Sequence, residues 1–151
     1  MNLGAVQRIF GMLLMVFSLT MLPPIGMSFL FEDQHAEPFV DAFLIVLATG
    51  LLIWWPARSF RRELRLRDGF LVVALFWIVL GLAGAVPLVL TDRPVMTLTD
   101  AVFEAVSGFT TTGATTLVGL DELPPSLLYY RQQIQWFGGI GIVVLAVALL
   151  P

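Results

Sequence analysis

The sequence predicts an all-α membrane protein in which a helix pair precedes one helix–re-entrant loop–helix repeat. Of its 151 residues, 58% are hydrophobic and only 13% are charged, whereas soluble domains are about 45–50% apolar and about 25% charged. The apolar residues gather in long runs, and one helical pattern between the last two runs is too short to cross a bilayer. These observations favour four membrane spans and one segment that enters the membrane and returns.

The first apolar run extends from Leu3 to Phe31 and is interrupted by Pro23 and Pro24. It is too long for a secretory signal peptide, and no small-residue cleavage site follows it. We therefore interpret it as an uncleaved first membrane helix. Because proline disrupts a continuing helix, the pair should either kink this helix or begin a short second segment.

Three further apolar runs complete the expected spans. They are Phe39–Trp55, which ends in an aromatic pair suited to the membrane interface, Phe70–Leu90, and Ser126–Leu150. As a helix, the second of these would be about 31 Å long, which matches the hydrocarbon core. We expect residues 1–68 to form the N-terminal helix pair with its cytoplasmic Arg-rich loop, and residues 69–151 to form the repeat.

The arginines predict the orientation of the chain. The loop between the second and third runs contains Arg58, Arg61, Arg62, Arg65 and Arg67. The loop after the first run, EDQHAEP, contains no Lys or Arg. The positive-inside rule therefore places the arginine-rich loop and the N-terminus in the cytoplasm. Binding of an anionic lipid or a nucleotide is an alternative explanation of the arginines.

A helical pattern that cannot span the membrane lies between the third and fourth runs. Apolar residues recur on one helical face at Leu98, Val102, Ala105 and Phe109. Thr97 and Asp100 fit the capping pattern of a helix N-terminus. A helix from Leu98 to Phe109 would be about 18 Å long, roughly half of a bilayer. Because the flanking spans end and begin on the same outer face, we expect residues 91–125, the pore segment, to dip into the membrane and return.

The returning part of this segment is SGFTTTGATT, residues 107–116, which is rich in threonine and carries no charge. A half-helix would direct the partial negative charge of its C-terminus toward the membrane centre, where it favours cations. Backbone carbonyls of the following chain could then replace the water of a cation, and Gly113 can adopt a positive φ at little cost. The pattern favours a cation selectivity filter. A polar loop on the outer surface is the alternative that these residues leave open.

Two charged residues lie at depths where charge is costly. Glu104 lies on the half-helix, and Arg131 lies in the outer part of the fourth span. We expect Glu104 either to form hydrogen bonds behind the filter or to pair with Arg131. The alternative is that Arg131 lies at the membrane interface beside Tyr129 and Tyr130.

Glycines in the spans should allow close helix packing. They are Gly81 and Gly84 in the third span, and Gly138, Gly139 and Gly141 in the fourth. A gating hinge is the alternative role for the last three.

The sequence shows no catalytic constellation, no phosphate-binding glycine loop and no nucleotide fingerprint, so we expect no enzyme. Any nucleotide dependence would then have to come from a partner. The single histidine, His35, lies in the outer acidic loop without another His or Cys nearby. We therefore expect no metal site at this residue.

Three stretches closely resemble the pore-forming membrane subunit of Trk-type bacterial potassium-uptake systems. They are FWIVLGLAGAVPL, TLTDAVFEAVSGFTTTGATTLVGLDELP and YRQQIQWFGGIGIVVLAVALLP. The resemblance covers nearly the whole chain and is strongest from Phe70 to Pro151. It implies a potassium channel-like fold, in which an extra helix pair precedes four helix–pore loop–helix repeats around one pore. It also implies potassium uptake across the bacterial inner membrane, with K⁺ as the transported ion and no other cofactor.

The resemblance further implies roles for single residues. The filter residues would be Thr110, Thr111, Thr112, Gly113, Ala114 and Thr115. Thr111 and Thr112 would be the K⁺ ligands through their backbone carbonyls, and Gly113 would be the filter glycine. The other three would flank the ion sites.

The chain departs from that family in holding only one repeat, and one filter strand cannot surround an ion. Either it is part of a full subunit that forms a homo-oligomeric dimer, or four copies assemble around one pore. The resemblance also implies a cytoplasmic nucleotide-binding regulatory subunit, and the expected surroundings are a lipid bilayer without nucleic acid. The alternative function is that of a non-conducting membrane interaction or regulatory subunit of a longer pore protein.

Overall fold

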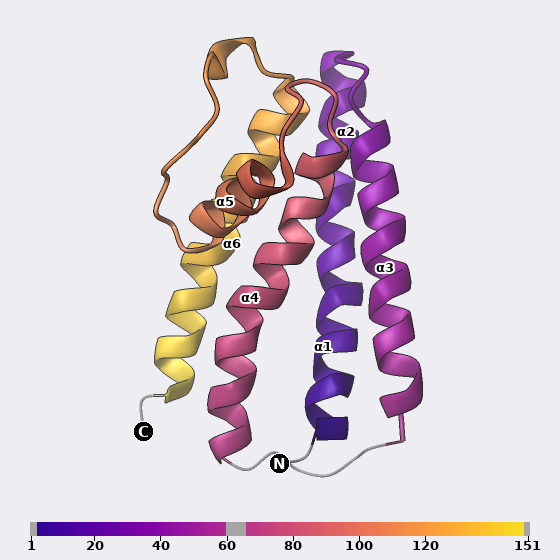
Figure 1. Cartoon of the computed structure of the whole chain (residues 1–151), viewed down its shortest axis with the longest axis vertical. Coiled ribbons are helices and arrows are strands. Elements are labelled where there is room, and N and C mark those ends of the chain that lie inside the picture. The colour runs from indigo at the N-terminus through magenta and orange to yellow at the C-terminus, as the bar shows by residue number, and fades with distance from the viewer. Residues whose placement is uncertain (1–2, 60–65, 150–151) are drawn as a thin grey trace.

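The computed structural model describes the backbone of residues 3–59 and 66–149, and helices dominate this part of the chain (Figure 1). The long helices lie side by side and run alternately up and down. The short helix α5, Leu98–Phe109, lies between α4, Leu66–Leu90, and α6, Pro125–Leu149. The chain after α5 returns to the end of the molecule at which α4 finishes (Figure 1). The pore segment therefore begins and ends on the same side, as the sequence predicts.

The first span consists of α1, Leu3–Ser18, a 3₁₀ turn at Leu19–Met21, and α2, Leu22–Phe31. Of the two outcomes expected for the prolines, the structure shows the second, because they lie in the first turn of α2. The N–H groups of a first turn have no partner within the helix, so prolines there remove no helical hydrogen bond.

Helix α3, Glu37–Ala57, packs against α1 at a close crossing. A Cβ atom added to Gly11 would lie 2.6 Å from the Cβ of Trp54, and one added to Gly50 would lie 2.9 Å from the carbonyl oxygen of Gly11. Only residues without a side chain fit at these positions. The crossing is therefore of the small-residue type that is common between membrane helices.

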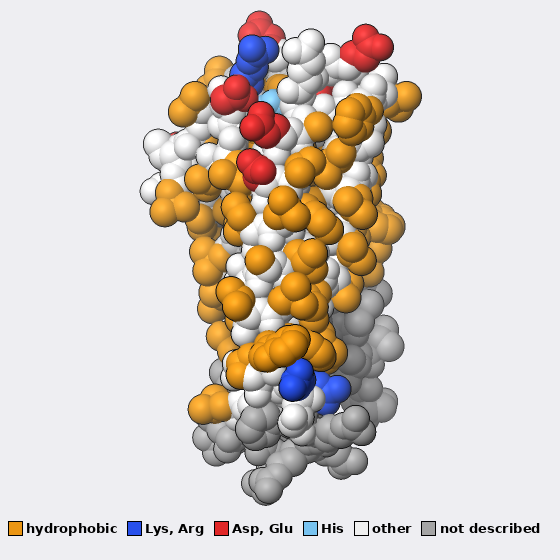
Figure 2. Space-filling view, turned by 90° about the vertical axis from the view of Figure 1, so that its right-hand side faces the viewer, with side chains coloured by type: hydrophobic (Ala, Val, Ile, Leu, Met, Phe, Trp, Pro, Cys, Tyr) orange, Lys and Arg blue, Asp and Glu red, His pale blue; other side chains and the backbone are white. Residues whose placement is uncertain are grey.

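Two described helical stretches, Leu3–Phe31 and Glu37–Ala57, are long and apolar enough to cross a membrane, and Ala74–Leu90 is a shorter apolar helix. Figure 2 shows an apolar band between two polar ends. Acidic side chains gather at one end, with a basic side chain beside them, and basic side chains lie near the other. Arg58 lies over the ring of Trp55 at 4.5 Å. Of the other predicted loop arginines, Arg61, Arg62 and Arg65 lie outside the described residues, as does the side chain of Arg67.

Aromatic contacts join the helix pair to the repeat. The rings of Phe17 in α1 and Phe109 in α5 have centroids 5.7 Å apart, and those of Phe39 in α3 and Tyr130 in α6 are 5.4 Å apart. The hydroxyl of Tyr130 donates to the carbonyl of Gly84 in α4 at 2.8 Å. All four aromatic residues belong to the buried core.

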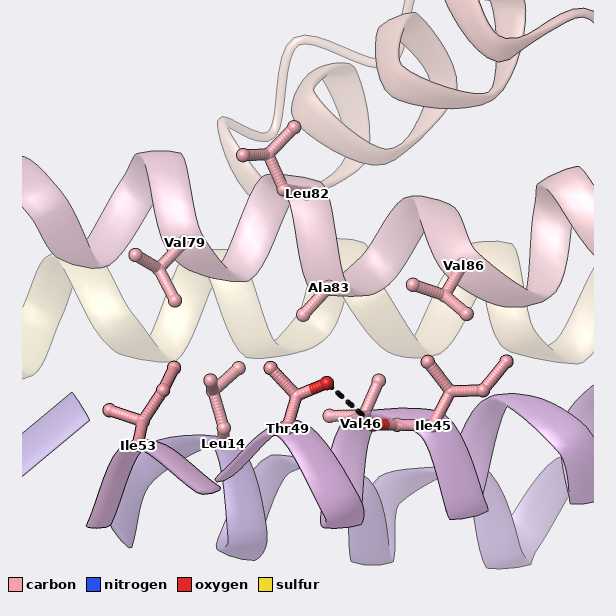
Figure 3. Close-up of a pocket in the computed structure, with 9 residues that line it drawn as sticks. All are labelled: Leu14, Ile45, Val46, Thr49, Ile53, Val79, Leu82, Ala83 and Val86. Carbon is pink, nitrogen blue, oxygen red and sulfur yellow. Dashed lines mark hydrogen bonds between the residues drawn. The ribbon is translucent and has the colours of Figure 1, made fainter. Parts of the chain in front are cut away.

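An apolar groove of about 280 Å³ separates α4 from α1 and α3 (Figure 3). Its lining includes Leu14, Val46 and Ala83. The hydroxyl of Thr49, also in the lining, donates to the carbonyl of Ile45 at 2.7 Å. Because this polar group is satisfied within its own helix, the groove presents an apolar surface.

Candidate pore-loop site

The half-helix α5 has the bounds that the sequence predicts, Leu98–Phe109, and begins with the predicted cap. The backbone N–H of Asp100 donates to the hydroxyl oxygen of Thr97 at 3.2 Å, and that hydroxyl donates to the carboxylate of Asp100 at 2.6 Å. The cap satisfies one of the N–H groups that a helix start leaves without a partner.

The buried face of α5 matches the predicted apolar stripe only in part. Ala105 and Phe109 are buried as predicted, whereas Leu98 is 67% exposed and Ala101 is buried instead. A Cβ atom on Gly108 would lie 2.6 Å from the Cδ1 of Ile134 in α6. The physical reason is the short distance between α5 and its neighbours, which favours small residues on this face. The ring of Phe109 fits because it lies against Gly84.

The predicted glycine packing is confirmed at three positions. A Cβ atom on Gly84 would lie 2.6 Å from the ring of Phe109, and one on Gly81 would lie 2.9 Å from Val106. On Gly138 it would lie 2.7 Å from the carbonyl carbon of Phe109 and nearer still to the oxygen. Among the described side chains, the nearest atoms to a Cβ on Gly139 and on Gly141 lie at 3.9 Å and 3.8 Å, which are ordinary contacts. Packing against these side chains does not require glycine at either position.

A Schellman motif ends α5 and turns the chain back. The N–H of Thr112 donates to the carbonyl of Ser107 at 2.9 Å, and the N–H of Thr111 donates to that of Gly108 at 2.9 Å. Thr111 has a φ of 56° and Gly113 a φ of 73°. The sequence indicated a positive φ at Gly113 only. A β-branched residue in the left-handed region costs about 1–2 kcal/mol, and such strain persists only where the surrounding structure imposes it.

Side chains of α5 hold the returning strand from behind. The hydroxyl of Ser107 donates to the carbonyl of Ala114 at 2.7 Å, and the hydroxyl of Thr110 donates to that of Val106 at 2.8 Å. The carbonyl of Ala114 is therefore directed at α5. Sequence reasoning missed Ser107, although a serine on the last turn of a half-helix, just before a strand that folds back, is a recognisable signal.

Glu104 lies at the centre of the support behind the strand. One carboxylate oxygen accepts from the hydroxyl of Thr115 and the N–H of Thr116, both at 2.6 Å. The other accepts from two guanidinium nitrogens of Arg131, at 2.9 Å and 3.1 Å. Glu104 is 3% exposed and Arg131 is 7% exposed. The structure thus places both of the contacts expected for Glu104 on one carboxylate.

The other side of the strand is open. Thr110, Thr111, Thr112, Gly113, Ala114 and Thr115 are all exposed. Within the described part of the chain, the carbonyls of Thr111, Thr112 and Gly113 accept no hydrogen bond. These oxygens can act as ligands for a hard cation, which prefers oxygen donors. A groove of about 420 Å³ lies beside them, lined in part by Phe103 and Val106 of α5.

A capped half-helix, a strand returning to the same face, and flanking long helices define the class of this protein. It is an all-α membrane protein, with a helix pair followed by one helix–re-entrant pore loop–helix repeat of a potassium channel-like fold. Residues 35–151 match the model of the TrkH family, described as cation transport protein. The chain belongs to this family.

Proteins of similar sequence and structure carry names of the same family. The Trk system potassium uptake protein TrkH of Halomonas elongata is 59% identical over all 151 residues, and that of Escherichia coli is 52% identical. The crystal structure of the potassium transporter TrkH from Vibrio parahaemolyticus superimposes with a TM-score of 0.95 at 52% identity over the whole chain. The chain spans 31% of the length of the two relatives and 32% of the crystallised chain.

Proposed function

We propose that residues 110–115 supply one strand of a K⁺ selectivity filter in a protein that takes up K⁺ across the bacterial inner membrane. The observation that carries this proposal is the two-sided strand. Its back is bound to α5 by Ser107 and Glu104, and its front presents the unbonded carbonyls of Thr111 and Thr112. Such carbonyls replace the hydration shell of an ion, and the C-terminus of α5 adds a favourable potential.

We propose Thr111 and Thr112 as the K⁺ ligands and Gly113 as the glycine that lets successive carbonyls turn to one side. Thr110 and Thr115 act as supports, since their hydroxyls donate to Val106 and Glu104. We propose no ion contact for the carbonyl of Ala114, which already accepts from Ser107.

The filter needs strands that this single repeat does not hold. Leu98 is 67% exposed and Phe103 45%, so α5 carries large apolar side chains that the described residues leave exposed. In the proposed assembly, these side chains pack against the equivalent elements of further repeats. These repeats come from a full subunit that dimerises, or from a tetramer of this chain.

The proposed orientation places the N-terminus and the arginine-rich loop in the cytoplasm, by the positive-inside rule. A regulatory subunit that binds a nucleotide would then contact the protein from the cytoplasmic side. The acidic outer end would lie where cations arrive and raise their local concentration. We propose residues 1–68 as the accessory helix pair and residues 69–151 as the pore repeat.

Substitution of Gly113 by serine tests this function, with Gly119→Ser as a matched control. Both glycines have a left-handed φ, 73° and 69°, so the backbone strain of a serine is similar. In the described part of the chain, neither has an atom within 3.4 Å of an added Cβ. In bacteria that lack their own K⁺ uptake, the whole gene product carrying Gly113→Ser should lose its preference for K⁺ over Na⁺. The Gly119→Ser protein should keep it. If both variants keep the preference for K⁺ over Na⁺, the result would instead favour the non-conducting alternative.

A further inference from the structure

The turn between α2 and α3, residues 32–36, contacts both ends of the pore segment. Thr91 is the first residue of that segment, and Ser126 directly follows its last residue. The ring of His35 contacts Thr91, and the carboxylate of Asp33 contacts Ser126. A short turn of the accessory helix pair thus holds the entry and the exit of the strand proposed as the filter.

Asp33 acts as a cap of α6 from a distant part of the chain. One carboxylate oxygen accepts from the hydroxyl of Ser28 and from the N–H of His35, the latter at 2.9 Å. The other accepts from the N–H of Ser126 at 2.9 Å, across 93 residues of sequence. Burial by itself raises the pKa of Asp33, but the hydrogen bonds outweigh it and hold the pKa below its usual value. An ionised carboxylate is stabilised at the positive end of a helix dipole.

His35 fixes the other end. It is 3% exposed, and its Nε2 atom lies 2.6 Å from the hydroxyl oxygen of Thr91, which is itself 4% exposed. That oxygen also accepts from the N–H of Arg93 at 3.3 Å. The ring packs edge-on against Phe39 of α3, with centroids 6.2 Å apart. The first turn of the pore segment is therefore bonded to the helix pair through a buried side chain.

We propose that Asp33 and His35 are positioning residues for the filter, acting as an outer staple that fixes the ends of α4 and α6 relative to each other. This proposal rests on the function proposed above. The route is continuous, because α6 carries Arg131 shortly after Ser126, and Arg131 is bonded to Glu104. Glu104 in turn holds the end of the strand through Thr115. A shift in the start of α6 thus moves the carboxylate that supports the strand.

The variant Asp33→Asn tests the staple. An amide has one acceptor oxygen where the carboxylate has two, so it cannot accept from all three donors at once. In the purified whole gene product, we expect amide hydrogen exchange across residues 110–125 to become about ten-fold faster. We also expect the ratio of K⁺ to Na⁺ uptake in cells to fall. Merely structural damage remote from the filter would leave that ratio unchanged.

One control matches this variant. Glu32→Gln removes the neighbouring negative charge, which lies on an exposed side chain. This control should exchange and transport like the wild type.

If amide hydrogen exchange in Asp33→Asn is as slow as in the wild type, the staple is overturned. If exchange is faster but the ratio of K⁺ to Na⁺ uptake is unchanged, the role of the staple at the filter is overturned. If the wild type transports no K⁺, the proposed function fails, whereas faster exchange in the variant still supports the staple. If Asp33→Asn does not accumulate in membranes, the same measurements on Ser28→Ala decide. This variant deletes one of the three donors, and wild-type values for it overturn the proposal.

Discussion

The carboxylate of Glu104 joins two parts of the candidate site, the returning strand and α6. It accepts from Thr115 and Thr116 on one side and from Arg131 on the other. Both charges are buried, so each depends on the other for its solvation. The charge and depth of these residues were visible in the sequence. Their common partner was not, since three segments have to meet before the contact exists.

Single and double substitutions test this pair. Glu104→Gln or Arg131→Gln alone should lower the free energy of unfolding by about 3–5 kcal/mol, because the remaining charge is buried without a partner. The double variant should lose less than the sum, since neither charge remains. Thermal unfolding of the four proteins in the same detergent measures the coupling. Strictly additive losses, or an unchanged K⁺ preference in the double variant, would argue against the supporting role.

His35 should make the stability of the outer end depend on pH. Burial lowers its pKa below the usual 6.5, against the opposing effect of Asp33 and Asp92 and with the help of Arg93. Above 6.5 the contribution of His35 is complete. As the pH falls from 6.5 toward the depressed pKa, the unfolded chain binds the proton more readily and stability decreases.

The midpoint temperature of thermal unfolding should therefore decrease as the pH is lowered from about 7.5 to about 5.5. The decrease should be smaller in His35→Gln. The two proteins are compared in one detergent at constant ionic strength. Parallel pH curves would show that His35 does not titrate with unfolding.

Among the elements, α5 shows which features of a helix can be predicted from local sequence patterns. Its length, its cap and its bounds follow from local residues, because Thr97 and Asp100 act within one turn. Its buried face follows only in part, because Ala105 and Phe109 are buried as predicted but Leu98 is exposed. In the structure, glycines of α4 and α6 let the neighbouring helices approach closely, and the ring of Phe109 fits only because Gly84 has no side chain.

Two adjacent glycines of α6 should respond in opposite ways to alanine. Gly138→Ala places a methyl group against the Phe109 carbonyl at the end of α5, and should destabilise the protein by about 1–3 kcal/mol. The added methyl group of Gly139→Ala meets no described atom nearer than 3.9 Å, and the variant should be neutral or stabilising by up to about 1 kcal/mol, since alanine favours a helix. Unfolding midpoints of both variants check this. Equal effects would contradict the close contact.

The turn at the end of α5 was only half predictable. The positive φ of Gly113 could be predicted, because glycine has no steric penalty in that region. Thr111 adopts the same region against its preference, and the two hydrogen bonds of the Schellman motif hold it there. The strained residue and the permissive residue flank Thr112, one of the two proposed K⁺ ligands.

For the whole molecule, the sequence predicted the order of the helices and the return of the pore segment, both of which the structure confirms. It did not predict how the helix pair meets the repeat. The contacts of Asp33 with Ser126 and of His35 with Thr91 join residues that no local pattern connects. The long apolar runs specify spans, whereas a few polar residues at the outer end specify their relative positions.

The central claim is that the strand from Thr110 to Thr115 binds K⁺ with its open face. The most direct measurement is anomalous X-ray diffraction from crystals of the whole gene product grown with Rb⁺ in place of K⁺. We expect an anomalous peak against the carbonyls of Thr111 and Thr112. Peaks only elsewhere in the molecule, with these carbonyls turned away, would contradict it.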